Sequence, residues 1–142
     1  MALTDDERLA WLRGVPLFRG CAEESLQRLA DRTAEIDFAT GAPIVQQGQV
    51  GNGLFILVLG SARVLTGEQE LARLGPGEVV GELSVIDQEP RVASVIALEP
   101  TTCLALASWD LLAVLDTDPR LARNLLSELA GRLRDADARI GQ

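Results

Sequence analysis

Two short segments of the chain combine residue types that suit the binding of a phosphate group. Gly81-Glu82-Leu83-Ser84 ends an apolar stretch and would open a short helical turn, and Pro90-Arg91-Val92-Ala93-Ser94 follows after a polar turn. Backbone amides at the start of a helix have no intrahelical acceptor, so they can donate to an anion. An arginine close by can hold a phosphate through two charge-assisted hydrogen bonds.

A carboxylate in such a site needs its own explanation, because Glu82 would repel a phosphate. It fits if it accepts a hydroxyl proton, and a ribose 2′-OH beside a phosphate would provide one. The alternative is a surface salt bridge between Glu82 and Arg91 on an ordinary β-turn. The order of Gly81, a short helix, a Pro-Arg pair and the small Ala93 favours the binding site.

The residue types that are missing exclude most catalytic chemistry. The chain has no His, Lys or Tyr, and all 13 basic residues are arginine. Histidine metal sites and Ser-His nucleophiles are therefore excluded, as are Schiff-base lysines and the lysine of a Walker motif. We expect no enzyme activity, no metal and no cofactor.

Composition predicts one acidic globular domain. The chain has 142 residues and a formal charge of −8, which disfavours binding to nucleic acid because phosphates repel an acidic surface.

Its longest apolar run, residues 54–59, is far shorter than the roughly 20 residues of a membrane helix. The acidic N-terminus lacks the basic start of a signal peptide, so we expect a cytoplasmic protein. Cys21 and Cys103 are expected to be small core residues rather than a disulfide.

The hydrophobic pattern changes twice along the chain. Thr4 and Glu7 match a capping box, which predicts a helix up to Gly14, and a second helix begins near residue 22. Short apolar runs separated by Gly and Pro then predict an antiparallel sandwich or roll. The expected strands are 34–38, 44–46, 54–59, 62–65, 70–74, 91–98 and 102–107. The aromatic residues expected in the core are Trp11, Phe18, Phe38, Phe55 and Trp109.

The C-terminal third is predicted to be helical. Ser108 or Asp110 could cap one helix, and Asp118-Pro119 begins a longer one. The longer helix carries an apolar stripe, which either covers the open edge of the roll or forms a homodimer seam or ligand lid. The stripe consists of Leu121, Leu125, Leu126, Leu129 and Leu133.

With these elements in place, residues 81–94, here named the cassette, resemble the phosphate-binding cassette of cyclic nucleotide-binding domains, without a gap. These domains occur in the catabolite activator protein and in regulatory subunits of cAMP-dependent kinases. Residues 47–56 resemble the Gly-rich hairpin of that family, Gly60 its turn glycine and residues 15–18 its entry segment. The resemblance extends from about residue 9 to residue 133.

The resemblance implies an α+β fold: a jelly-roll-like antiparallel β-roll of about eight strands, flanked by N-terminal helices and two C-terminal helices. The single domain would comprise N-terminal helices (1–32), the roll (33–107) and lid or dimer helices (108–142). By position, Glu82 would accept from the ribose 2′-OH and Arg91 would pair with the cyclic phosphate. The backbone amides of Gly81, Leu83, Ser84, Val92 and Ala93 would surround the sugar-phosphate.

The chain departs from the family in three places. Gln49 and Asn52 replace residues that are usually acidic, in the hairpin rather than in the cassette. Val92 stands where many cGMP-preferring relatives have Thr, whose hydroxyl can reach guanine, so cAMP is favoured over cGMP. The expected partners are a cyclic nucleotide, an unidentified effector protein and a second copy bound through the last helix; no nucleic acid or membrane is expected.

Three other functions compete with a cyclic nucleotide sensor. A cupin-type enzyme would share the sandwich pattern, but cupins generally hold their metal with histidine. A transcription factor would need a DNA-binding module after the long helix, so this chain could be the sensor part of a longer regulator. A domain that keeps the fold only for dimerisation would not need Glu82 and Arg91 together.

Overall fold

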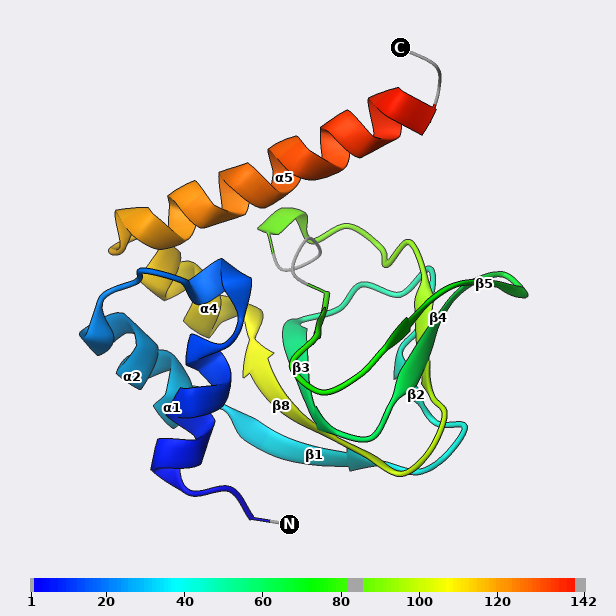
Figure 1. Ribbon diagram of the computed structural model, residues 1–142, viewed down its shortest axis with the longest axis horizontal. Helices are drawn as coiled ribbons and strands as arrows, with labels where there is room; N and C mark the ends of the chain where they lie inside the picture. Colours follow the sequence, from blue (N-terminus) through cyan, green and yellow to red (C-terminus); the bar gives the residue numbers. More distant parts are fainter. Residues whose placement is uncertain (1, 82–85, 140–142) are drawn as a thin grey trace.

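The computed structural model of the protein describes residues 2–81 and 86–139 (Figure 1). The helices are α1 (Asp5–Arg13), the 3₁₀ helix η1 (Pro16–Phe18), α2 (Glu23–Arg32), α4 (Ser108–Leu115) and α5 (Pro119–Arg139). The strands are β1 (Ala34–Phe38), β2 (Pro43–Val45), β3 (Gly53–Leu59), β4 (Ala62–Thr66), β5 (Gln69–Leu74), β6 (Val79–Val80), β7 (Ser94–Ala97) and β8 (Thr101–Ala107).

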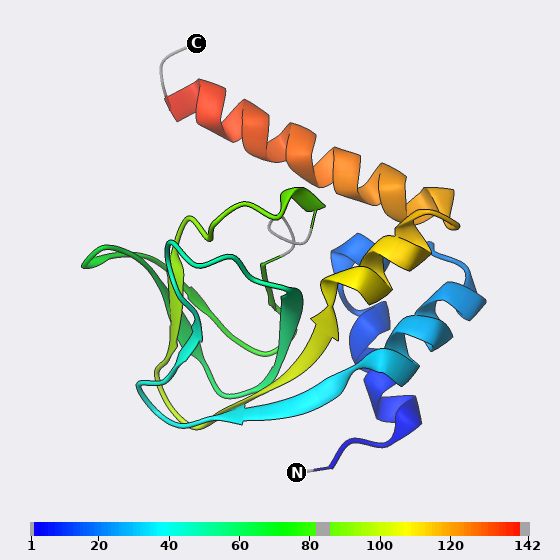
Figure 2. The same cartoon turned by 180° about the vertical axis from the view of Figure 1, so that it is seen from behind.

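The strands form two four-stranded antiparallel sheets. The first has the order β1-β8-β3-β6 and the second β2-β7-β4-β5. Both views show α1, α2 and α4 on the outer side of the first sheet, with the second sheet opposite (Figures 1 and 2). The predicted fold class, an antiparallel β-roll flanked by helices, is confirmed.

The central strands of the first sheet, β3 and β8, are buried on both faces, which explains why they are nearly continuous apolar runs in the sequence. One side of β3, with Leu54 and Ile56, packs with the helices, and Leu104 and Leu106 of β8 do the same. The alternate residues face the interior of the roll, where Leu57 and Cys103 contact the second sheet. Two cores therefore share one sheet.

Local capping positions α1 and α5 as the sequence predicts. The prediction that Ser108 or Asp110 caps α4 was wrong, because the N-cap of that helix is Ala107 and no side chain caps it. Thr4 and Glu7 form a capping box at the start of α1, with hydrogen bonds of 2.9 and 3.2 Å. At the other end of the chain, the buried Asp118 accepts from the backbone N–H of Arg120 at 3.0 Å and so caps α5. The same carboxylate accepts from the Ala22 N–H at 3.0 Å and the Ser25 hydroxyl at 2.6 Å. Asp118 thus joins the starts of α2 and α5.

Two strand predictions need correction. The strand expected over 91–98 is shorter, because residue 91 bonds through its backbone to the loop at 48–49 instead of to a neighbouring strand. The two-residue strand β6 was not predicted from the sequence. It pairs with Phe55 and Ile56 of β3, and its two residues are too few to show an alternation.

The apolar stripe of α5 is divided between buried and exposed residues. Leu121 and Leu125 are buried in the core that α5 shares with η1 and α4, whereas Leu126 and Leu133 are each 66% exposed. The stripe therefore covers the N-terminal helical layer rather than an edge of the roll. Residues 130–139 are all exposed, and this part of α5 extends past the rest of the molecule (Figures 1 and 2).

The remaining predictions concern single side chains. Phe18 is buried and Phe38 packs edge-on against Phe55, but Trp109 is 66% exposed on α4, so its core assignment was wrong. Cys103 is fully buried, and burial raises the pKa of its thiol to about 12. Both cysteines are free thiols. None of the described helices combines the length and the apolar character that crossing a membrane requires.

Candidate functional site

The backbone of Arg91 is fixed against the glycine-rich loop that precedes β3. Its N–H donates to the Gln49 carbonyl and its carbonyl accepts from the Gly48 N–H, both at 2.8 Å. The preceding Pro90 forms an isolated antiparallel bridge with Val50. The loop and the cassette therefore lie side by side, although some forty residues separate them in sequence.

The guanidinium group of Arg91 is buried, and not all of its N–H donors are used by the described residues. The residue is only 6% exposed, and its Nη2 donates to the Gly53 carbonyl at 2.7 Å. Its Nη1 is buried without a hydrogen-bond partner among the described residues, none of whose carboxylates forms an ion pair with it. Burial lowers the pKa of Arg91, but an arginine remains charged at neutral pH. A buried cation without a counter-charge is costly, so this site favours an anion.

Two glycines make room for this guanidinium. A Cβ atom at Gly51 would overlap Nη2, and one at Gly81 would overlap Nη1. Gly81 also has a φ of 93°, a conformation that residues with a side chain rarely adopt. Both positions therefore require glycine while Arg91 keeps this conformation.

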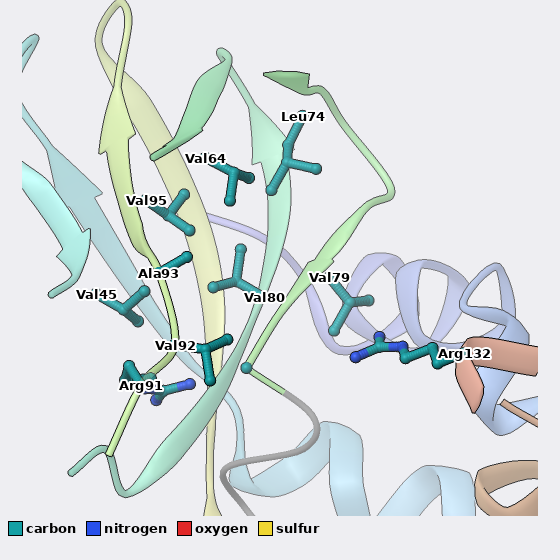
Figure 3. Close-up of a pocket in the computed structure, with 11 residues that line it drawn as sticks. Val45, Val64, Leu74, Val79, Val80, Arg91, Val92, Ala93, Val95 and Arg132 are labelled. Atoms are coloured by element: carbon teal, nitrogen blue, oxygen red, sulfur yellow. The ribbon is translucent and has the colours of Figure 1, made fainter. Parts of the chain in front are cut away.

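Arg91 lies at one end of a cavity of about 230 Å³ inside the roll (Figure 3). The far end is reached by Arg132 of α5, whose side chain extends toward Val79. Most of the remaining wall is apolar. It consists of Val45, Val64, Leu74, Val79, Val80, Gly81, Val92, Ala93 and Val95. The cavity thus combines cationic groups at its ends with an apolar middle.

The structure brings together four of the seven residues that the sequence predicts for the site. Gly81, Arg91, Val92 and Ala93 all line this cavity, and Val92 is 83% exposed. Glu82, Leu83 and Ser84 lie outside the described residues, so their roles stay predictions. The described residues contain no group of three or more Cys, Asp or Glu side chains that could hold a metal ion.

Sequence reasoning missed Arg132 and all valines of the cavity wall except Val92. Arg132 lies outside the apolar stripe predicted for the last helix, and nothing in its spacing distinguishes it from Arg134 or Arg139. Val64 and Val95 belong to paired strands of the second sheet, β4 and β7. A period-two pattern could have placed them on one face, but it could not show that this face borders a cavity.

Comparison with known proteins decides what kind of domain contains this cavity. Residues 35–118 match the family described as "Cyclic nucleotide-binding domain", which is more than half of the chain. The chain belongs to the cyclic nucleotide-binding domain family. The family resemblance inferred from the cassette is therefore confirmed.

The chain is similar to a receptor protein and to a protein kinase of this family. It is 40% identical over 134 residues to the "Cyclic AMP receptor protein" of Thermus thermophilus, covering 91% of this chain and 62% of that protein. It is 39% identical over 105 residues to a cGMP-dependent protein kinase (isozyme 1) of Drosophila melanogaster, covering 68% of this chain and 14% of the kinase.

A solved structure of the same family supports the fold. The regulatory domain of Toxoplasma gondii PKA, determined with cAMP, superimposes with a TM-score of 0.77 at 27% identity, covering 90% of this chain and 50% of that chain. The chain spans less than two thirds of the length of either curated relative. These relatives therefore contain further parts that this chain does not match.

Proposed function

We propose that this chain is a regulatory module that binds a cyclic nucleotide, with cAMP preferred over cGMP. The observation that carries this proposal is the guanidinium of Arg91, which is buried at the end of a cavity with one nitrogen unpartnered among the described residues. A cyclic phosphate would supply the missing acceptor and the missing negative charge together. The family to which the chain belongs supports the same ligand.

The cassette residues would divide the sugar-phosphate between them. Arg91 would pair with the cyclic phosphate, and Glu82 would accept from the ribose 2′-OH. The amides of Gly81, Leu83, Ser84, Val92 and Ala93 would donate to the phosphate and sugar oxygens. The apolar middle of the cavity suits the uncharged parts of a nucleotide, because ligand sites are mostly apolar with a few polar groups that fix orientation.

The preference for cAMP rests on Val92. Its side chain lines the cavity and is largely exposed, so it is accessible to a bound purine. Valine has no hydroxyl that could hydrogen-bond a guanine.

The signal would leave the module through α5. Arg132 lines the cavity at a point where α5 has no buried residues, whereas the beginning of α5 is anchored by Asp118 and Leu121. A ligand that contacts Arg132 in only one position of the helix would shift the population toward that position. Coupling free energies of this kind are typically about 1–3 kcal/mol.

The output beyond this chain is also a proposal. The Thermus relative is longer than the segment that matches, which favours the sensor part of a longer regulator over an isolated domain. Leu126 and Leu133 are exposed on α5 and could form a homodimer seam. No catalytic step is proposed, because the chain lacks His and Lys and no metal cluster is found in its described part.

Thermal unfolding with added nucleotides tests the function. A ligand that binds only the folded state at 100 times its Kd adds about 2.7 kcal/mol to the free energy of unfolding. We expect cAMP to raise the Tm in proportion to the logarithm of its concentration, and cGMP to need a higher concentration for the same shift. 5′-AMP serves as the control for a non-cyclic phosphate. A Tm that neither cyclic nucleotide changes would overturn the proposal.

The role of Glu82 has a separate test in the variant Glu82→Gln. Wild-type protein should bind cAMP more tightly than 2′-deoxy-cAMP, because the carboxylate accepts from the 2′-OH. Hydrogen bonds to charged groups contribute about 1.5–3 kcal/mol, and most of this difference should disappear in the variant. Calorimetric titration of both ligands into both proteins measures it. Equal discrimination in the two proteins would exclude Glu82 as the ribose contact.

A further inference from the structure

A second cavity, of about 400 Å³, opens on the other side of Arg91. It lies where β1 and β2, the edge strands of the two sheets, approach the loop of residues 46–53. Arg91 and Val45 border both cavities. We call the two cavities the first and the second chamber; they share these two residues, and the proposed nucleotide site occupies only the first.

The second chamber is lined by positive charge in an acidic protein. Its charged lining residues among those described are Arg32 and Arg91, with no carboxylate, although the chain has 21 acidic residues. Arg32 ends α2 and is exposed, and its guanidinium makes no hydrogen bond or ion pair within the described part of the chain. A lining of this kind favours a small anion.

The other lining groups indicate what else the anion must carry. The side-chain amides of Gln46, Gln49 and Asn52 have no hydrogen-bond partner among the described residues and can donate to an oxygen. The lining of the chamber also includes apolar side chains, among them the buried Ile44 and the half-buried Phe55. A volume of about 400 Å³ lies within the usual range for small-molecule sites.

We propose that this chamber binds a small organic carboxylate with an apolar body, at a site that shares only Arg91 with the nucleotide cassette. The carboxylate would lie near Arg32 and the three amides, and the apolar body would contact Ile44 and Phe55. No covalent step is involved. The existence of this site does not depend on the nucleotide proposal.

A regulatory consequence does rest on the proposed function. The loop that lines the second chamber also supplies the Gly53 carbonyl that holds Nη2 of Arg91. A carboxylate in the second chamber would contribute negative charge on the far side of the same guanidinium. It should therefore weaken the attraction between Arg91 and a phosphate in the first chamber.

The site is tested with phenylacetate as the probe and the isosteric neutral phenylacetamide as its control. Both are titrated into the ¹⁵N-labelled chain without nucleotide, and amide shifts are followed by NMR. We expect saturable shifts with phenylacetate in residues 34–36, 46–53 and 105–107. Phenylacetamide should bind about tenfold more weakly, the factor that corresponds to losing one charge-assisted hydrogen bond.

Matched variants separate the site from general attraction of anions. Arg32→Gln removes an unpaired exposed charge at the chamber, and Arg63→Gln removes an exposed charge on β4, outside its lining. Arg32→Gln should weaken phenylacetate binding about tenfold, while Arg63→Gln should leave it unchanged. Equal effects of the two variants, or equal binding of the two probes, would overturn the proposal. The spectra themselves report whether each variant is folded.

The predicted weakening of cAMP binding by a carboxylate in the second chamber is measured separately. Calorimetry of cAMP with and without saturating phenylacetate should show a cAMP Kd raised at least about fivefold, the lower end of typical allosteric couplings. An unchanged Kd would overturn the coupling while leaving the site intact. Absence of cAMP binding in the control titration would count against the nucleotide proposal and not against the second site.

Discussion

Replacing Arg91 with alanine is expected to weaken cAMP binding by about 2–5 kcal/mol, the range for truncating one partner of a buried charge pair. The guanidinium is buried, holds the Gly53 carbonyl with Nη2 and leaves Nη1 for the ligand. Alanine removes both the charge and the two-pronged geometry. Calorimetric titration of cAMP measures the loss at a temperature where circular dichroism shows both proteins folded.

Two further variants distinguish charge from geometry at this position. Arg91→Lys keeps the charge but not the planar fork, so its affinity should lie between those of wild type and Arg91→Ala. Gly51→Ala keeps Arg91 but places a Cβ where its guanidinium now lies, and should also weaken binding. Unchanged cAMP affinity in Arg91→Ala would contradict the assignment of the phosphate site.

Replacing Asp118 with alanine is expected to lower the free energy of unfolding by about 2–4 kcal/mol, through loss of a helix cap and of hydrogen bonds to a charged group. The buried carboxylate accepts from Ala22, Ser25 and Arg120, so its removal leaves three donors unpaired where α2 and α5 meet. Urea unfolding followed by circular dichroism measures the effect. Asp116→Ala, at an exposed position two residues earlier, is the matched control.

The difference between wild type and Asp118→Ala should depend on pH. The hydrogen bond from Ser25 is the main cause of the lowered pKa of Asp118, followed by those from backbone amides. A carboxyl group whose pKa is lower in the folded state stabilises the protein above its unfolded pKa, near 3.9. The stabilisation should therefore be complete above about pH 5 and decline as the pH falls below about 4. A difference that stays constant down to pH 2 would contradict this role for the ionised form.

The sequence predicted the fold well wherever local signals were strong. The capping box of Thr4 and Glu7 and the start of α5 at Asp118-Pro119 follow from hydrogen-bonding rules that act within a few residues. The two-residue strand β6 was missed, since its pairing depends on β3, more than twenty residues away. Its apolar residues alone do not distinguish a strand from a loop.

The candidate site was predictable only in part, for a similar reason. The order of residues in the cassette indicated Arg91 as a phosphate ligand, but not that its guanidinium would be buried beside Gly51. That contact joins segments about forty residues apart. Arg132 was missed because its place at the cavity depends on the path of α5 relative to the roll. Such a path is set by packing at Leu121 and Leu125, and not by the residues near Arg132.

The uneven anchoring of α5 makes it a lever arm. Its fixed end is held by Asp118, Leu121 and Leu125, and the 14 residues that follow Leu125 extend the helix by roughly 20 Å at 1.5 Å per residue. A tilt of about 10° at the fixed end would move the far end by about 3–4 Å over that length. Small adjustments in the helical layer are therefore amplified most at Arg139. Any chain that continues beyond α5 would experience them as a change of position, even if the roll itself stayed rigid.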